Sequence, residues 1–395
     1  MANSSTSSAL RYMLIALSTS VRVPTNRKRS AQRVFRGDTN HGINSTSSTL
    51  RYILIALVAA SLAGCSSGDS WKKVDVSAIP APVHTLRFEQ DLYAMDTNNL
   101  MGSEQALIAK YGSFYPYYVT QIMNWGQPNN RIDTARHDPH IDIEAFLRNP
   151  SDRSLYDTVE KQYKDISDIQ KGISGMAQHF KYYFPKKRTV TTLYTFISEF
   201  GNGAATYGDT IICVGLDMYL GDKYIYYGSF DFPEFMKRKL RREYIVPNAT
   251  EALYNEHFDK TAYNAELPLI EAIINEGKKY YFMECMLPET PDSLLIGYTS
   301  VQEEWCRKSE GSIWKYFNEQ DLLYKVNFME QKRYTSDGPT TGGMPPESPG
   351  KVGSWVGWQI VRKFMKNNSG KVSLDDLMNK YTAKQILSLA NYKPK

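Results

Sequence analysis

The chain has 395 residues, of which 42% are hydrophobic and 23% are charged, with 25 glycines and 18 prolines. This composition is typical of a folded globular protein and excludes a collagen-like, coiled-coil, mainly disordered or multi-spanning membrane protein. The net charge of +5 comes from the first 64 residues, which hold eight basic side chains and one acidic side chain. The remaining residues carry 39 basic and 41 acidic side chains, so we expect no nucleic-acid partner.

The amino-terminal region has the features of a targeting segment. Residues 5–17 and 45–57 are identical at 11 of 13 positions, and each copy places one arginine before an apolar run. Only the second copy continues through small residues to Gly64 and Cys65, a pattern typical of a secretory signal peptide. We therefore predict that residues 1–64 form a signal region, with the first 44 residues an over-extended start or a partial duplication.

The end of this region predicts a lipid anchor. Leu62-Ala63-Gly64-Cys65 resembles the bacterial lipobox, in which the cysteine is lipidated and becomes the first residue of the mature protein. We expect cleavage before Cys65, acyl chains that attach the protein to a membrane of the cell envelope, and a periplasm-facing body. Residues 65–79 are predicted to form a flexible tether. The alternative is a buried cysteine after a failed signal.

The three remaining cysteines predict no disulfide framework, because three thiols cannot all pair. Cys213 lies in an apolar, strand-like run and is expected to be a buried thiol. A disulfide between Cys285 and Cys306 is the less favoured alternative.

The elements predicted for the mature chain begin with a strand over residues 83–88 and mixed helical pieces over residues 100–150. Apolar residues at helical spacing then predict one long helix from Pro150 to Pro185. Residues 188–200 and 206–216 are rich in β-branched and aromatic residues and flank Gly201-Asn202-Gly203, which predicts an antiparallel hairpin.

The rest of the pattern is helical, over residues 233–244, 246–257, 267–286, 300–317 and 354–365. A small antiparallel sheet within many helices gives the α+β class. No Ser/Gly-rich linker interrupts residues 80–395, so we expect a single, mainly helical domain there.

Two local patterns resemble catalytic or metal-binding motifs. His137 and His140 stand three residues apart, as a helical metal-binding pair does, but Pro139 between them favours a polar loop. Ser348 and Lys351 have the Ser-x-x-Lys spacing of a nucleophile, but the intervening Pro-Gly breaks the helical turn that this chemistry needs and favours a loop.

Acidic residues surround the predicted hairpin at Asp209, Asp217 and Asp222. Asp217 follows an apolar run and is either a catalytic base or a buried structural partner, and we favour the structural role. The sequence has no His-Glu-x-x-His motif, phosphate-binding loop, dinucleotide fingerprint or Gly-x-Ser-x-Gly elbow. We therefore expect no metal and no cofactor.

Residues 338–357 are dense in glycine and proline, which predicts an ordered loop of defined shape. We expect two tryptophans to seat the helix that follows. The outer face of the segment is either a surface for a partner or only a cover over the core. The candidates for this surface are Met344, Glu347, Lys351, Trp355 and Trp358.

Several long strings, in chain order, resemble the gliding-motility lipoprotein GldB family of Bacteroidetes. They occupy residues 86–92, 180–185, 207–221, 296–302, 314–317 and 338–362, and the resemblance covers nearly all of residues 65–395. It implies an envelope lipoprotein needed for gliding and connected with type IX secretion.

The layout is also similar to that of a group of predicted zinc proteases. This second resemblance places a metal-binding helix over residues 246–254, with Thr250, Glu251 and Tyr254 where His-Glu-x-x-His is needed and a third ligand near Glu276. Threonine and tyrosine do not replace two histidines as zinc ligands. The resemblance therefore implies a fold whose active site is lost.

Three functions follow from these observations. The leading one is a non-catalytic envelope component that binds protein partners of the gliding and secretion machinery. The second is an envelope hydrolase that uses Glu251, Glu276 or Asp217 without zinc. The third is a passive binder of peptide or glycan, suggested by 28 tyrosines against 16 phenylalanines.

Overall fold

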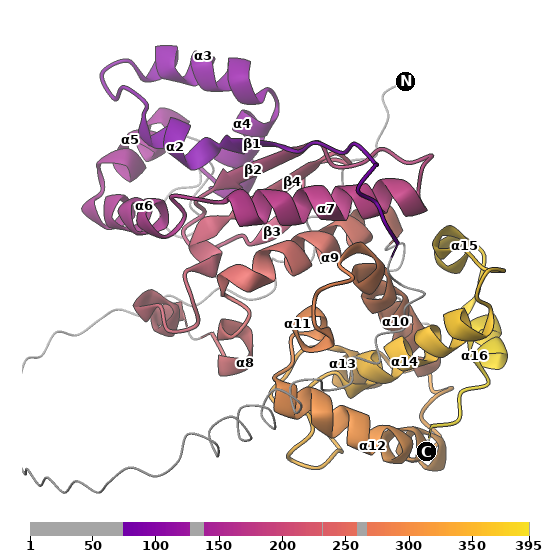
Figure 1. Ribbon diagram of the computed structural model, residues 1–395. Coiled ribbons are helices and arrows are strands. Elements are labelled where there is room, and N and C mark those ends of the chain that lie inside the picture. Colours follow the sequence, from indigo (N-terminus) through magenta and orange to yellow (C-terminus); the bar gives the residue numbers. More distant parts are fainter. Residues whose placement is uncertain (1–73, 127–137, 231, 259–266, 395) are drawn as a thin grey trace, which may run out of the picture. The chain divides into compact units, whose positions relative to one another are not determined.

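In the computed structural model, which describes residues 74–126, 138–230, 232–258 and 267–394, four short strands form one mixed sheet (Figure 1). The strand order is β1-β2-β4-β3. β1 (His84–Arg87), β2 (Thr192–Phe196) and β4 (Ile211–Gly215) are parallel, and β3 (Ala204–Thr206) is antiparallel to β4. β2 and β4 are buried from their second residue onward, as strands are in a parallel sheet that is covered on both faces.

The predicted antiparallel pairing of residues 188–200 with residues 206–216 is wrong. β2 and β4 lie parallel, with Thr192 opposite Ile211. The chain between them reverses direction twice, because β3 returns along β4 and forms the antiparallel hairpin with it. The turn packs closely against β4 at Gly215, where a Cβ atom would lie 2.0 Å from the carbonyl oxygen of Asn202.

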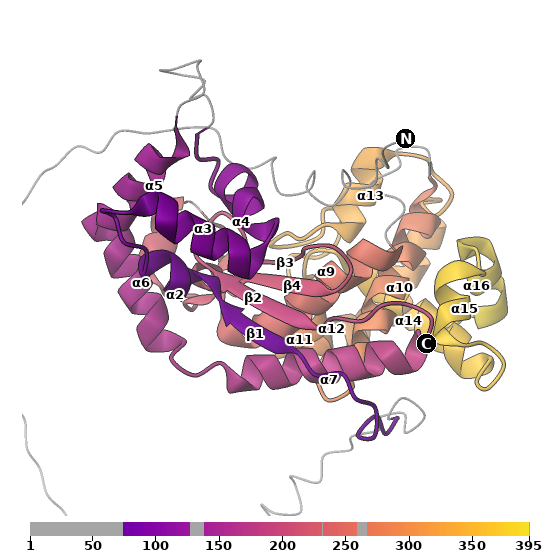
Figure 2. The ribbon, with the colours of Figure 1, turned by 90° about the horizontal axis from the view of Figure 1, so that it is seen from above.

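The helices α2–α6 lie to one side of the sheet in both ribbon views (Figures 1 and 2). They are α2 (Phe88–Tyr93), α3 (Leu100–Tyr111), α4 (Phe114–Tyr117), α5 (Pro139–Arg148) and α6 (Pro150–Gln162), and α7 (Ser167–Tyr183) follows. The single helix predicted over residues 150–185 is therefore two helices. The chain turns at Tyr163, which is fully buried and donates its hydroxyl to the carbonyl oxygen of Tyr219.

The helices that follow the sheet match the predicted ranges closely, with one exception. Residues 233–244 form only the one-turn helix α8 (Glu234–Lys237) and a 3-10 turn at Arg242–Tyr244. The predictions for residues 246–257, 267–286, 300–317 and 354–365 are confirmed within a few residues at each end. The elements are α9 (Ile245–Phe258), α10 (Leu269–Met286), α11 (Asp292–Ile296), α12 (Ser300–Glu319), α13 (Phe328–Thr335), α14 (Val352–Asn367), α15 (Leu374–Asn379) and α16 (Ala383–Ala390).

The helices α10 and α14 pack closely against each other and contribute many residues to the hydrophobic core. Trp355 and Trp358 of α14 are 1% and 0% exposed, which confirms that they seat this helix. The indole Nε1 of Trp358 donates to Glu284 Oε2 over 2.9 Å, and the Arg362 guanidinium lies 4.0 Å from the centre of the same ring. Both tryptophans are therefore core residues and cannot form part of a partner surface.

These elements confirm the mainly helical α+β class. Residues Asp75–Lys395 form one compact unit, and the packed chain begins before residue 80, because Val76 is buried and Gln178 donates to the carbonyl oxygen of Ile79. Cys213, Cys285 and Cys306 are buried and form no disulfide bond within the described residues, so the Cys285–Cys306 alternative is wrong.

The signal region and Cys65 lie outside the described residues, and their cleavage and lipidation stay predictions. A search of the described helices finds none with the length and apolar character of a membrane span.

Candidate functional site

The two carboxylates of the predicted degenerate site meet over a lysine. On α10, Glu276 and Lys279 stand one helical turn apart, and Lys279 Nζ lies 3.0 Å from Glu276 Oε2. The same ammonium lies 2.9 Å from Oε1 of Glu251 on α9. The Lys279 charge holds the pKa of Glu251 below its usual value. Burial disfavours the charged form of Lys279, but the two carboxylates outweigh burial and raise its pKa.

A second charged group lies where the loop after α13 meets α8 and α14. The Asp337 carboxylate is shared by Lys239, at 2.7 Å, and Lys351, at 2.8 Å, and Lys351 Nζ also donates to the Tyr280 hydroxyl over 3.0 Å. Burial raises the pKa of Asp337, but the two ammonium groups outweigh burial and lower it. Lys351 is 6% exposed and takes a left-handed backbone conformation at the start of α14. It is therefore a buried structural residue, and its assignment to the partner surface is wrong.

Polar side chains of the Gly/Pro-rich loop are turned inward and fix its shape. Thr341 Oγ1 donates to the carbonyl oxygen of Pro349 over 2.7 Å, and Ser348 Oγ accepts from the Thr341 backbone amide. Ser354, at the start of α14, donates to Glu276 Oε2 and is fully buried. Thr341 and Ser348 are each 1% exposed, which confirms the ordered loop.

The outer residues of this loop have a different environment. Glu347 is exposed and Met344 is partly exposed, so these two of the five predicted surface residues remain available to a partner. Pro345 and Pro346 between them are also exposed.

The residues at the predicted metal positions do not fit a zinc ion. Thr250 is fully buried, donates to the carbonyl oxygen of Val246 and contacts Met176 Sδ. Tyr254 packs its ring against Phe258 and Phe282. The Lys279 ammonium lies between the Glu251 and Glu276 carboxylates, in the place that a metal ion bound by both would occupy. No group of three or more His, Cys, Asp or Glu gathers among the described residues, and the expectation that no metal binds stays a prediction.

The other motifs have structural environments. His140 lies in the first turn of α5, with Pro139 as its first residue, so the predicted polar loop is wrong at this position. His140 is 2.9 Å from Glu104 Oε2, and His137 lies outside the described residues. Ser348 and Lys351 lie in a loop, as predicted, and have separate hydrogen-bond partners.

Asp217 has the structural role that we favoured. Its carboxylate is fully buried and accepts hydrogen bonds from the backbone amides of Ser198 and Phe200. Burial raises the pKa of Asp217 to about 6, although these amides oppose the shift. Asp209 instead lies near the exposed Arg188, at 3.2 Å.

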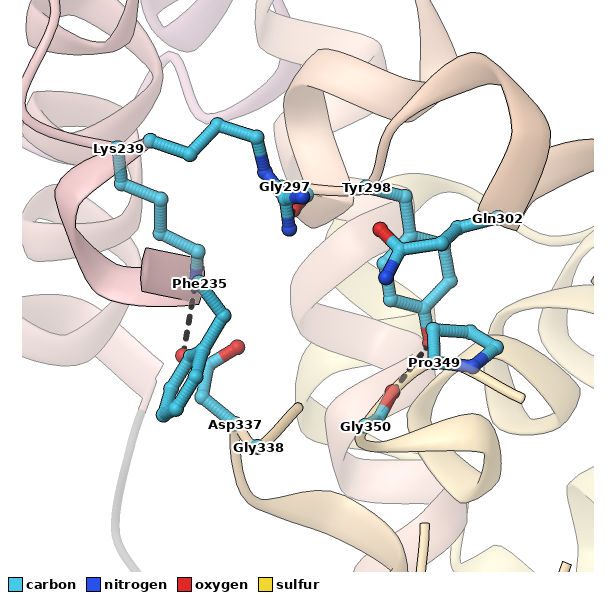
Figure 3. A pocket seen from close by; sticks show the side chains of 10 residues that line it. Phe235, Lys239, Gly297, Tyr298, Gln302, Asp337, Gly338, Pro349 and Gly350 are labelled. Carbon is cyan, nitrogen blue, oxygen red and sulfur yellow. Dashed lines mark hydrogen bonds and ion pairs between the residues drawn. The ribbon is translucent and has the colours of Figure 1, made fainter. Parts of the chain in front are cut away.

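A small pocket adjoins the Asp337 group (Figure 3). Its walls include Phe235 in α8, Arg238 and Lys239 just after α8, Gln302 on α12, and the backbone of Gly338 and Gly350. Figure 3 shows Lys239 and Phe235 on one side of the pocket and Tyr298, Gln302 and Pro349 on the other.

Sequence reasoning found Glu251, Glu276 and Lys351 but missed Lys239 and Asp337. The three-residue spacing from Glu276 to Lys279 was a usable signal for an ion pair on one helix. Nothing in the sequence indicated that Lys239 and Asp337, 98 residues apart, form a 2.7 Å pair.

This arrangement is chemically a set of paired charges. Glu251, Glu276 and Asp337 each have an ammonium nitrogen within about 3 Å, so none is a free base.

The fold and site define a mainly helical α+β protein in which Glu251, Glu276 and Asp337 are each paired with a lysine and whose ordered loop presents a small exposed surface. The family model for gliding motility protein GldB matches residues 69–394, and the chain belongs to this family. The protein is thus associated with gliding motility and belongs to a lipoprotein family, which indicates an envelope anchor. No curated protein and no solved structure matches the chain significantly.

Proposed function

We propose that this protein is a non-catalytic, lipid-anchored component of the gliding machinery that binds protein partners through the exposed part of its Gly/Pro-rich loop. Its anchor is Cys65, its body faces the periplasm, and its partners belong to the gliding apparatus and the associated type IX secretion machinery. The observation that carries the proposal is the contrast within this loop. Thr341 and Ser348 are buried and fix the loop, whereas Glu347 projects outward.

A rigid loop of this kind suits binding. Its backbone is ordered before any partner arrives, so association loses less conformational entropy than it would with a flexible segment. Met344 adds a partly exposed, adaptable apolar side chain beside the charge of Glu347. Pro345 and Pro346 further restrict the backbone between them.

The charge pairs support a non-catalytic role. A general base must accept a proton, and Lys279 lowers the pKa of Glu251 and so favours its charged, unprotonated form. The same ammonium also contacts Glu276. The alternative of a hydrolase that uses these carboxylates has no support in this geometry.

Site-specific photo-crosslinking in living cells tests the proposal. A photoreactive amino acid replaces Glu347, and the matched control replaces Leu389, an exposed residue of α16. We expect position 347, but not position 389, to crosslink to an envelope protein whose own deletion abolishes gliding. The same adducts at both positions, or none at position 347 in gliding cells, would contradict the proposal.

A further inference from the structure

Arg238, one of the residues that line the pocket beside Asp337, has a side-chain donor without a partner. Arg238 Nη2 donates to the carbonyl oxygen of Gly297 over 3.1 Å. Its Nε is buried and has no hydrogen-bond partner in the part of the chain that the structure describes. Buried charged donors are normally paired, so this nitrogen lacks the acceptor that its environment calls for.

The charged groups around the pocket carry a net positive charge. Arg238, Lys239 and Lys351 provide three positive charges, and Asp337 is the carboxylate that both lysines share. The neighbouring Lys279 is already matched by Glu251 and Glu276, which leaves the whole cluster with four cations and three carboxylates. Burial and the proximity of Lys351 lower the pKa of Lys239 to about 8. A bound anion would stabilise the charged form of Lys239.

The pocket wall offers further donors. Gln302 Oε1 accepts from the Thr299 amide, so the Nε2 group of Gln302 is free to donate elsewhere. Figure 3 shows the Gln302 amide directed toward the middle of the pocket. Gly297 lets Lys239 lie along this wall, because a Cβ atom at position 297 would lie 2.5 Å from Lys239 Cε.

The size of the pocket limits the ligand. Its enclosed space is about 10 Å³, roughly the room that one water molecule needs, and the pocket is partly open to solvent. Sites for whole organic ligands are usually larger, at roughly 300–1,000 Å³. The enclosed part therefore admits a single oxygen atom of a charged group, and the rest of that group would face solvent.

We propose that this pocket binds a single oxyanion group, a carboxylate or a phosphate, through Arg238 and Lys239 with help from the Gln302 amide. The guanidinium and ammonium are the side chains that recognise such groups in proteins. The inference goes beyond the proposed function and is independent of it, since partner binding at Glu347 does not require an occupied pocket.

Ligand-observed NMR with the full-length mature lipoprotein in detergent tests the proposal. Inorganic phosphate and acetate are the two probes, at constant ionic strength set with chloride. We expect saturable binding of at least one probe, weakened at least tenfold in Arg238→Gln and Lys239→Gln. Lys237→Gln, which removes a positive charge one residue before Arg238 and outside the pocket, is the matched control and should bind as the wild type does.

The two probes distinguish the sources of the anion. Binding of phosphate alone supports a phosphate-bearing ligand, and binding of acetate alone supports a carboxylate. Absence of saturable binding of both probes would overturn the proposal, and so would equal binding by the wild type and both pocket variants.

A second measurement needs no variant. Amine-directed labelling of the wild type, read by mass spectrometry, should slow severalfold at Lys239 when the bound probe is present, while labelling at Lys237 stays unchanged. Equal labelling of Lys239 with and without the probe would overturn the proposal even if the pocket variants fail to fold.

Discussion

Lys279 joins two helices through charge. Its ammonium contacts Glu251 on α9 and Glu276 on α10, and its side chain is 13% exposed. Removing one member of a buried ion pair leaves the other charges desolvated and uncompensated.

We therefore expect Lys279→Met to lower the free energy of unfolding by about 1–3 kcal/mol, less than for a fully buried triad because the carboxylates are partly solvated. Chemical denaturation of the purified protein measures this. The control is Lys308→Met on α12, whose pair with Glu304 is exposed and should change stability by less than about 0.5 kcal/mol. Equal stability of the two variants would mean that the Lys279 bridge is not structural.

His257 should make the protein less stable at acidic pH. Its ring packs 4.9 Å from that of Phe180, its buried Nε2 has no partner within the described chain, and burial lowers its pKa to about 4. Below pH 6.5 the unfolded chain binds a proton at this histidine, whereas the folded chain does not until about pH 4. His257 thus has no effect above pH 6.5 and destabilises the fold as the pH falls toward 4.

His257→Phe should remove this contribution. Between pH 7.5 and 4.5, its free energy of unfolding should fall by about 2 kcal/mol less than that of the wild type. Urea denaturation at the two pH values measures the difference. Parallel losses in the two proteins would show that His257 takes up its proton in the folded state.

At the scale of elements, the close packing of α10 and α14 depends on glycine. A Cβ atom at Gly357 would lie 1.8 Å from the carbonyl oxygen of Ile273, and one at Gly277 would lie 2.2 Å from the carbonyl oxygen of Gly357. Both contacts are with backbone atoms, which cannot move aside as the end of a side chain does.

Gly357→Ala should therefore destabilise the protein by about 2–3 kcal/mol through overpacking. The matched control is Gly175→Ala in α7, where a Cβ meets nothing within 4 Å and the change should stabilise by about 0.5–1 kcal/mol. Thermal unfolding of both variants checks the pair. If Gly357→Ala were as stable as Gly175→Ala, the described packing of α10 on α14 would be incorrect.

The sequence predicts helices better than strand directions. The α9, α10, α12 and α14 ranges follow from helical spacing, which is a local property. The direction of β4 depends on β3, a three-residue strand too short to produce a recognisable pattern. The unbroken apolar run of β4 was a signal for a buried parallel strand that the glycines of the preceding turn obscured.

The same division holds for the candidate site. Glu251 and Glu276 could be picked out from chain order, but their ammonium partner is set by the distance between α9 and α10. Lys351 and Trp358 were expected at a surface, but both are buried. The Lys351 ammonium pairs with Asp337, and the Trp358 indole donates a hydrogen bond to Glu284. Such long-range pairs have no local signature.

At the scale of the whole molecule, the anchor is the first test. Cys65→Ala should release the protein from membranes or leave an uncleaved precursor, because the acyl chains are the predicted attachment. Fractionation of cells followed by mass spectrometry of the amino terminus measures both outcomes. An unmodified Cys65 in membrane-bound protein would rule out lipidation as the means of attachment.

The central claim is that this protein supports gliding by binding through its exposed loop and not by catalysis. The most direct test is the gliding speed of cells whose own copy is replaced by variants present at wild-type levels. We expect Glu251→Gln combined with Glu276→Gln and Lys279→Met, which removes all three charges of the bridge together, to glide at wild-type speed. Met344→Ala combined with Glu347→Ala should glide poorly while staying folded. Loss of gliding in the carboxylate variant together with normal gliding in the loop variant would contradict the account.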